Sequence, residues 1–349
     1  MATKTVQNEL DRSTRPGELV QKLPGGVLIC TACGHLCKLR PGQRGICKVR
    51  FNEAGVLRVP FNYAAGVHND PIEKKPFFHV LPGSSAMSFG MLGCDFHCSY
   101  CQNWFTSQAL RDDASTLNFS SITAAEICDL AEQRGSKSVI STYNEPLITS
   151  EWAVEVFRAA KERGLRTGYV SNGHGTPEVL EYLQPWLDLF KIDLKSFSAK
   201  NYRRLGGNLD AVLETIRQVH AMGFWTEIVT LVVPDYNDSD EELTQMAEFI
   251  AGVSVDIPWH VTGFYPTYKM TDRESTPAAT LLRARQRGIE AGLKFVYSGN
   301  RTGQVENTES TFCPKCSEVV IERWGFQVVA NRLVSGDCPK CLEPIPGKW

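Results

Sequence analysis

The sequence predicts an α/β protein built on a TIM-like, partial (β/α)6 barrel of parallel strands with a small metal-binding module at each end. Three observations lead to this fold class. Strand-like runs alternate with helix-like runs from about residue 86 to 305. Polar segments of unusual composition follow several of those strands. Cysteine-rich segments that are too short to build a core of their own flank the alternating region on both sides.

The alternation rests on seven apolar runs, which we expect to be strands: 87–92, 138–142, 167–171, 189–194, 227–233, 259–264 and 295–298. Between them, apolar residues recur at helical spacing, as in Ile127, Leu130, Ala131 and in Trp152, Val156, Phe157, Ala160. Gly135 and Gly164 stand where these helices should end. Such alternation favours a parallel sheet with crossover helices, here an open barrel of six or seven strands.

Polar segments follow four of these strands: 143–146 (YNEP), 171–173 (SNG), 193–195 (DLK) and 299–300 (GN). A parallel barrel places its active site at the carboxyl ends of its strands. A turn or a helix cap would explain each segment taken singly. Their occurrence at the same end of the barrel indicates a binding site there.

The bulk composition describes an ordinary globular enzyme-sized chain of 349 residues, 42% of them hydrophobic, with 37 basic and 39 acidic side chains. This near-neutral balance does not indicate a nucleic-acid partner. No apolar run approaches the ~20 residues needed to cross a bilayer, and the first residues lack the apolar stretch of a signal peptide. We therefore expect a cytoplasmic protein with no membrane partner.

Eleven of the twelve cysteines fall into three spaced groups, which in a reducing compartment favours metal binding over disulfides. The groups are Cys30, Cys33, Cys37 and Cys47; Cys94, Cys98 and Cys101; and Cys313, Cys316, Cys338 and Cys341. The remaining residue, Cys128, is expected to be a buried thiol on a helix.

The central group has the spacing C-x3-C-x2-C in one loop directly after the first barrel strand. Three thiolates suit a 4Fe-4S cluster and leave one iron open for chemistry. The alternatives are a zinc site with His97 as a nearby fourth ligand, or three buried thiols. The presence of the loop at the mouth of the barrel favours the cluster.

This loop, GCDFHCSYCQN, resembles the signature of the radical S-adenosylmethionine (SAM) superfamily, in the branch of glycyl-radical-enzyme activases. The resemblance implies that Cys94, Cys98 and Cys101 hold a 4Fe-4S cluster that cleaves SAM to a 5'-deoxyadenosyl radical. It also implies an electron donor such as ferredoxin or flavodoxin. Hydrogen abstraction from a substrate would follow, and the sequence does not identify that substrate.

The same resemblance implies SAM-binding roles for residues of the strand-end segments. The YNEP segment matches the family's G-G-E-P in position, with both glycines replaced, so Glu145 would contact the SAM ammonium and Asn144 would be a weaker partner. The other expected SAM-binding residues are Tyr100, Asn172, Asp193, Lys195, Gly299 and Asn300, with Lys195 near the SAM carboxylate and Gly299–Asn300 near adenine.

Both flanking cysteine groups predict metal sites. The two C-P-K-C knuckles, separated by 21 residues, have the spacing of a zinc ribbon, and four thiolates leave no position open for substrate. Rubredoxin-like iron is the alternative there. The N-terminal group, C-x2-C-x3-C-x9-C, suits either structural zinc, which we favour, or an auxiliary 4Fe-4S cluster.

The expected domain organisation follows from these groups. It consists of a polar tail (1–19), a Cys-rich metal module (20–60), a connecting segment (61–85), the partial barrel (86–305) and the zinc ribbon (306–349).

Taken over nearly the whole chain, the motifs resemble the radical SAM proteins of the AmmeMemoRadiSam system, distant relatives of pyruvate formate-lyase activating enzyme. That resemblance implies Memo-like and AMMECR-like partner proteins and specifies no reaction. Activation of a glycyl-radical enzyme is the alternative function. A non-catalytic scaffold that holds zinc at all three cysteine groups is the second alternative.

Overall fold

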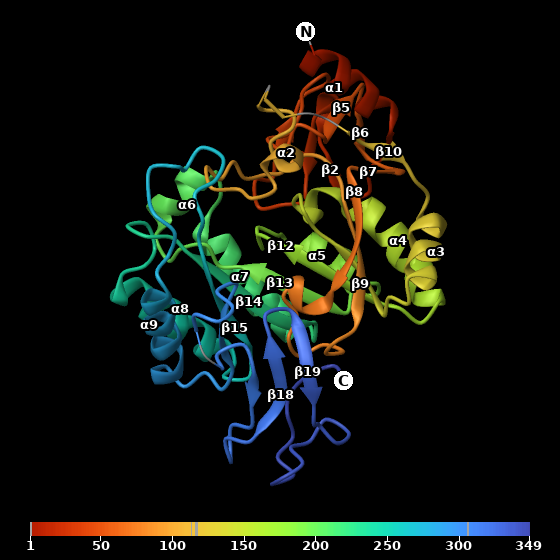
Figure 1. Ribbon diagram of the computed structural model, residues 1–349. Coiled ribbons are helices and arrows are strands. Elements are labelled where there is room, and N and C mark those ends of the chain that lie inside the picture. The colour runs from red at the N-terminus through yellow and green to blue at the C-terminus, as the bar shows by residue number, and fades with distance from the viewer. Residues whose placement is uncertain (1, 113, 116–117, 306) are drawn as a thin grey trace. The chain divides into compact units, whose positions relative to one another are not determined.

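The computed structural model describes residues 2–112, 114–115, 118–305 and 307–349 (Figure 1). These residues form two compact units, each assembled from separate chain segments. The first contains residues up to 69, 86–190 and 202–224, and the second contains 70–85, 191–201 and 225–349. Of the divisions predicted at residues 19, 60, 85 and 305, the one at 85 coincides with the end of one of these segments, and the other three do not.

The first unit carries parallel strands in the order β12-β11-β9, with β8 (Gly66–Pro71) next to β9. Strand β9 spans Ser85–Gly90, β11 Ser138–Ser141 and β12 Arg166–Ser171, and β11 pairs with both of its neighbours in parallel. All three strands fall where the sequence predicts them. Their inward residues, such as Phe89 and Ile140, are buried.

Helices connect these strands. They are α2 (Trp104–Ser107), α3 (Ala124–Gln133), α4 (Ser150–Glu162), α5 (Pro177–Leu183) and α7 (Leu209–Ala221), with the short η3 turn at Pro146–Thr149. Helix α3 begins with a capping box between Thr123 and Glu126 and is followed by Gly135 at φ 66°. The predicted apolar face of α4 is buried, and Cys128 is a buried thiol of α3, as predicted.

Strand β13 (Leu189–Asp193) and helix α6 (Ala199–Leu205) each pass from one unit to the other. Just before β13, the Asp188 backbone N–H donates to Thr167 O of β12 in the first unit. Beyond its end, the Leu194 N–H donates to Val229 O of β14 in the second unit.

The second unit continues with parallel strands β14 (Trp225–Val232), β15 (Trp259–Gly263) and β16 (Val296–Gly299). Helices α8 (Asp240–Val253) and α9 (Ala278–Glu290) alternate with them. The indole of Trp259 is fully buried. Among the described residues the strand order in each unit is open rather than closed into a ring.

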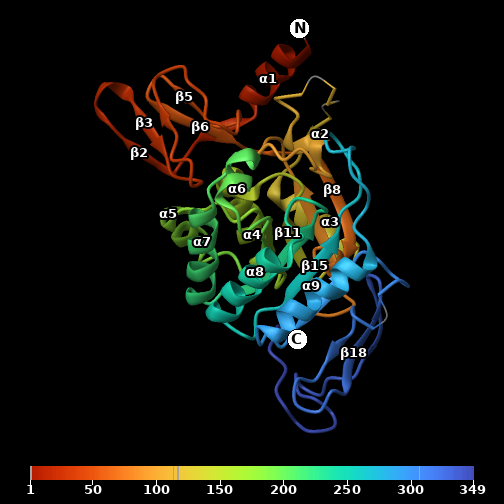
Figure 2. The same cartoon turned by 90° about the vertical axis from the view of Figure 1, so that its left-hand side faces the viewer.

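The N-terminal part of the first unit consists of short antiparallel sheets (Figure 2). One sheet has the order β1-β6-β5, with β1 at Thr14–Pro16, β6 at Val56–Pro60 and β5 at Phe51–Glu53. The other has the order β2-β3-β4, with β2 at Val20–Lys22, β3 at Leu28–Cys30 and β4 at Lys38–Leu39. A 3-10 turn, η1, spans Pro24–Gly26, and β7 (Tyr63–Ala64) pairs with β10 (Ser120–Ser121).

Within residues 1–19, predicted as a polar tail, the structure has regular secondary structure. Residues Ala2–Arg12 form helix α1, and β1 follows it. Leu10 and Leu19 are buried, and the Arg15 guanidinium lies 4.0 Å above the centre of the Phe61 ring. The sequence hides these anchors because they are single apolar residues and one cation–π contact rather than a periodic face.

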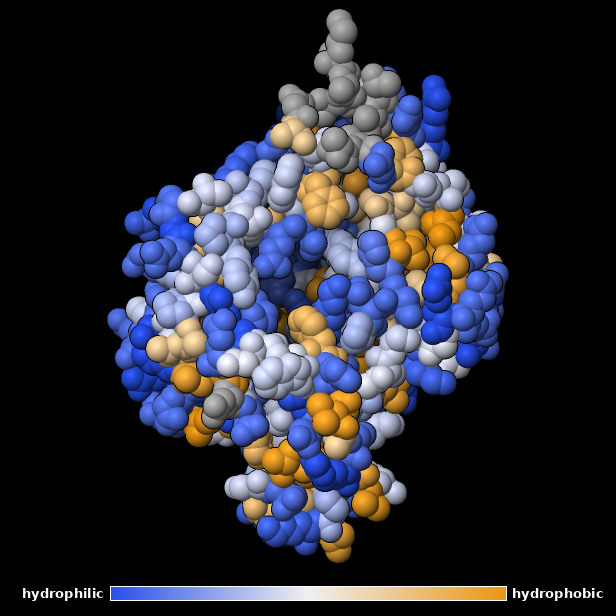
Figure 3. Space-filling view, viewed as in Figure 1, coloured by the Kyte–Doolittle hydropathy of each residue, from blue (hydrophilic) through white to orange (hydrophobic). Residues whose placement is uncertain are grey.

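The C-terminal part of the second unit is a three-stranded antiparallel sheet of β17 (Thr311–Phe312), β18 (Val319–Trp324) and β19 (Gln327–Asn331). Figure 3 shows apolar side chains on the surface of this part among polar ones, and the exposed ones include Trp324, Val329 and Leu342. No helix among the described residues is long and apolar enough to cross a membrane.

Candidate functional site

The central cysteine loop runs from the end of β9 to α2 in the first unit. The Phe96 backbone N–H donates to Cys94 Sγ at 3.3 Å, and Cys101 Sγ lies 3.2 Å from Ser107 Oγ. Hydrogen bonds of this kind stabilise thiolates and tune the potential of an iron-sulfur cluster. The donor set therefore fits a cluster held by three thiolates.

The surroundings of Cys94 set the charge state of its thiol before any metal binds. Burial, with help from the Asp95 carboxylate, holds the pKa of Cys94 well above the ordinary value of 9.0. A metal must therefore displace a proton from Cys94. The Cys98 and Tyr100 side chains are also buried.

The alternative in which His97 completes a zinc site lacks support in the geometry. The His97 ring packs against Gly206, where an added Cβ would lie 2.4 Å from Nδ1. Among the described residues, the groups whose ligand atoms lie within 4.8 Å of one another include neither His97 nor Cys94, Cys98 and Cys101.

Asp95, directly after Cys94, is the centre of a buried polar network. Its carboxylate accepts hydrogen bonds from Asn172 Nδ2 at 2.8 Å and from His174 Nδ1 at 3.0 Å. Burial alone would raise the pKa of Asp95, but the His174 contact holds it below its ordinary value. Sequence reasoning found Asn172 and missed Asp95 and His174.

Glu145 is held by donors from two strand ends. Its Oε1 accepts from Leu147 N at 3.0 Å and from Ser171 Oγ at 2.7 Å, and its Oε2 accepts from Asn172 N at 2.7 Å. Burial, reinforced by the Asp95 charge, raises the pKa of Glu145 to about 8. Since a carboxylate accepts about four hydrogen bonds, Oε2 has capacity for one more donor.

The two residues that replace the glycines of the G-G-E-P pattern have distinct tasks. Tyr143 has φ 73°, the left-handed backbone that glycine adopts most easily. The Asn144 side chain accepts from Met91 N at 2.9 Å and donates to Glu145 O at 3.1 Å, so it ties the end of β9 to the YNEP segment.

The other strand-end residues lie in the second unit. Lys195 Nζ donates to Asp193 at 3.1 Å, and Lys191 also pairs with that carboxylate. Despite burial, the two lysines lower the pKa of Asp193 to about 2. Asn300 Oδ1 accepts from Gly263 N at 2.7 Å and its Nδ2 donates to Gly263 O at 2.8 Å, which joins the ends of β15 and β16, where Gly299 is the last residue of β16.

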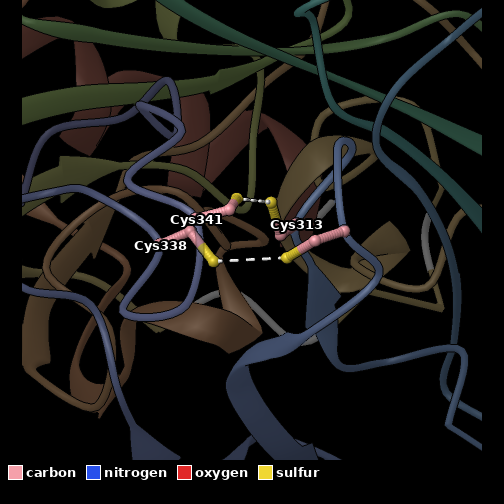
Figure 4. A group of neighbouring side chains, drawn as sticks. Cys313, Cys338 and Cys341 are labelled. Atoms are coloured by element: carbon pink, nitrogen blue, oxygen red, sulfur yellow. Dashed lines mark hydrogen bonds between the residues drawn. The ribbon is translucent and has the colours of Figure 1, made fainter.

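The four C-terminal cysteines come together in the second unit, with their sulfur atoms all within 4.8 Å of one another. Figure 4 shows the two knuckles facing each other, with Cys313–Cys341 sulfurs 3.5 Å apart and Cys316–Cys338 sulfurs 3.6 Å apart. Each knuckle ends in a left-handed residue, Ser317 and Leu342. The set can hold one metal ion.

Two ion pairs link the C-terminal knuckles to each other. Lys315 of the first pairs with Glu343 after the second, and Lys340 of the second pairs with Glu318 after the first, each at 3.4 Å.

The N-terminal cysteines lie near one another but are bound into different contacts. Arg50 Nε donates to Cys30 Sγ at 3.2 Å, and the Ile46 N–H donates to Cys37 Sγ at 3.5 Å. An added Cβ at Gly45 would lie 3.6 Å from Cys37 Sγ and 3.7 Å from Cys47 Sγ. Cys33 instead belongs to a group with Asp95 and His174.

Arg50 also joins the N-terminal cysteine module to helix α4. Its guanidinium makes hydrogen bonds of 2.6 and 2.7 Å to the two oxygens of Glu151, and both side chains are buried. The module is thus held by a bidentate ion pair that sequence reasoning missed, in addition to any metal.

The segment 70–76 (DPIEKKP) anchors the C-terminal sheet. Glu73, in the 3-10 turn η2 (Ile72–Lys74), pairs with Arg323 of β18 at 3.5 Å, and both are fully buried. His79 Nε2 contacts Tyr297 Oη at 2.6 Å. These pairs join residues far apart in the chain, which no local pattern reveals.

Comparisons with known proteins bear on this geometry. Residues 90–249 match the family model described as Radical SAM superfamily, a range that contains the central loop and its surrounding network. The chain is thus a radical SAM enzyme with the α/β fold of that superfamily. It produces a 5'-deoxyadenosyl radical from SAM, which requires an electron donor.

More particularly, the chain belongs to the same family as the uncharacterized protein MJ0808 of Methanocaldococcus jannaschii. The two are 34% identical over 341 residues, 95% of this chain and 98% of the relative. Pyruvate formate-lyase-activating enzyme of Clostridium pasteurianum is 24% identical over 56% of this chain and 85% of its own. Streptococcus suis SuiB, solved with its precursor peptide SuiA, has a TM-score of 0.48 and 17% identity over 66% of this chain and 51% of its own.

Proposed function

We propose that Cys94, Cys98 and Cys101 hold the 4Fe-4S cluster at which this enzyme cleaves SAM. The hydrogen-bonded thiols of one loop, beside the buried Glu145–Asp95–Asn172 network, are the observation that supports it. When bound, the cluster supplies the electron that breaks the SAM sulfonium bond and gives methionine and the 5'-deoxyadenosyl radical.

The residues of the chain bind and orient SAM. Glu145 Oε2 receives the SAM ammonium as its remaining donor, and Asn172 holds Glu145 and Asp95 in place through its backbone N–H and side-chain amide. Tyr100, buried in the loop, packs near the adenosine.

We propose that the strand-end residues of the second unit have the SAM-binding roles that the sequence resemblance implies. Lys195 neutralises the SAM carboxylate while Asp193 orients its ammonium group. Gly299 and Asn300 offer backbone to the adenine, because the Asn300 side chain is engaged by Gly263. In the first unit, the Asn144 side chain joins the end of β9 to the YNEP segment after β11.

The C-terminal knuckles hold zinc in a structural ribbon. Support comes from four sulfurs at tetrahedral spacing with no position left for a substrate. The N-terminal cysteines, Cys30, Cys33, Cys37 and Cys47, hold a second metal centre, either zinc or an auxiliary cluster.

Hydrogen abstraction is directed at a substrate that the comparisons leave open. The similarity to the C. pasteurianum pyruvate formate-lyase-activating enzyme favours, as a second candidate, abstraction from a glycine of a partner enzyme. Ferredoxin or flavodoxin would supply the electron in the cytoplasm, and Memo-like and AMMECR-like proteins are the proposed partners.

The test is anaerobic reconstitution with iron and sulfide, reduction with dithionite in the presence of SAM, and quantification of 5'-deoxyadenosine. We expect Cys98→Ala to fall to the background rate and Cys128→Ser, which changes a buried thiol outside the three groups, to keep the wild-type rate. Equal deoxyadenosine from Cys98→Ala and wild type would overturn the assignment of the cluster ligands.

A further inference from the structure

His174 is a buried histidine with one ring nitrogen in use. Its Nδ1 lies 3.0 Å from Asp95 Oδ2, and its side chain is only 1% exposed. Since Asp95 carries a carboxylate, Nδ1 holds the proton of the ring and Nε2 carries the lone pair.

That second nitrogen, Nε2, has no hydrogen-bond partner among the described residues. Buried polar atoms nearly always have one. A histidine that binds a metal through one nitrogen typically donates its other N–H to a carboxylate, which fixes the ring orientation. The Asp95–His174 pair has this arrangement.

The chain that approaches His174 belongs to the N-terminal cysteine module. The Gly34 N–H donates to His174 O at 2.8 Å, and a Cβ added to Gly34 would lie 2.7 Å from Nε2. Glycine at this position lets the module come close to the ring edge.

Cys33, the neighbour of Gly34, supplies a sulfur at the same place. Cys33 Sγ, a His174 ring nitrogen and an Asp95 carboxylate oxygen all lie within 4.8 Å of one another, and all three side chains are buried. Thiolate and imidazole are the ligands that Zn²⁺ prefers, at ~2.0–2.3 Å from the metal.

We propose that His174 is a ligand, together with Cys33, of a zinc-class ion in the N-terminal module, and that Asp95 is the positioning residue that orients the His174 ring. The metal of the module is then bound from the barrel as well as from the cysteines. This extends the proposed N-terminal metal centre and does not depend on SAM cleavage. It also connects that centre to Cys94 through a single residue, Asp95.

The first experiment measures zinc and iron per chain in the purified full-length protein. We expect His174→Ala and Cys33→Ser each to lose one metal ion per chain relative to wild type. The matched control is His35→Ala, which removes a neighbouring imidazole that is not a proposed ligand. The His35 ring lies 4.7 Å from the His174 ring, and His35 Nε2 contacts Asp95 O. This control should retain the wild-type metal content. Unchanged metal in His174→Ala would overturn the proposal.

X-ray absorption at the zinc edge covers the case in which His174→Ala fails to fold. Wild-type protein should show imidazole scattering on top of the sulfur shell, and His174→Cys should bind the same amount of zinc without it. An all-sulfur zinc environment in the wild type would overturn the proposal. Deoxyadenosine assayed on the same samples reports separately on the SAM reaction.

Discussion

The C-terminal cysteine knuckles and the Cys94–Cys101 loop both offer cysteine thiols as ligands, but they differ in the number of thiols and in what surrounds them. The knuckles bring four sulfurs within 4.8 Å of one another, and these cysteines pack in or against a buried apolar cluster that includes Phe78 and Ile321. The loop offers three thiols and places a buried network of Asp95, Glu145 and Asn172 beside them. On the proposed assignments, the number of thiols and the polarity around them together distinguish a closed structural site from a reactive one.

The largest effect that tests this comparison should come from opening the closed site. Cys338→Ser removes one of four ligands, so we expect the C-terminal metal to be lost. Stability should fall by several kcal/mol, on the order of 10 °C in the unfolding temperature. Metal analysis and calorimetry would measure this.

The rate of deoxyadenosine formation at low temperature should stay near wild type in Cys338→Ser. A variant that keeps its metal but loses SAM cleavage would contradict the separation of the two sites.

A smaller effect on stability should come from Glu145, in the buried network beside the Cys94–Cys101 loop. Because the pKa of Glu145 is raised to about 8 from an ordinary 4.5, the folded state keeps a proton that the unfolded state has lost between these values. Stability from this group is therefore lost as the pH rises from about 4.5 to about 8. The unfolding temperature of metal-free wild type should fall more steeply over this range than that of Glu145→Gln.

The matched control for this pH series is Glu162→Gln, at an exposed position near the end of α4. It should reproduce the wild-type slope. Identical slopes in wild type and Glu145→Gln would show that burial does not shift the Glu145 carboxyl.

The smallest effect is expected at the knuckle ion pairs. Lys315 and Lys340 are largely exposed, and such pairs contribute ~0.2–1 kcal/mol. Lys315→Ala and Lys340→Ala should each lower stability by no more than about 0.5 kcal/mol, measured by denaturant unfolding, with zinc retained. Loss of zinc from either variant would show that the ion pairs, and not the thiols alone, close the site.

The sequence predicted the strands and the C-terminal cysteine cluster because both leave local signals, the alternation of apolar runs and the paired C-x2-C spacing. It did not predict the partners that hold the site. Asp95 lies between two cysteines of the C-x3-C motif, which does not specify the residue at that position. His174 lies two residues after Asn172, and no local sequence pattern predicts that it is buried. The Arg50–Glu151 and Glu73–Arg323 pairs join residues 101 and 250 positions apart, and only tertiary structure brings them together. Helix α1 was missed because a single buried leucine gives no periodicity.

The left-handed backbone of Tyr143 has a consequence for how this branch of enzymes is recognised. In residue identity, the YNEP segment has neither of the two glycines of the family's G-G-E-P segment. Read as torsion angles, position 143 keeps a conformation that glycine adopts freely and tyrosine rarely does. The ring that replaces hydrogen there lies edge-on to His68, with centroids 5.4 Å apart. Relatives in which both glycines have diverged are thus better sought by backbone shape than by residue identity.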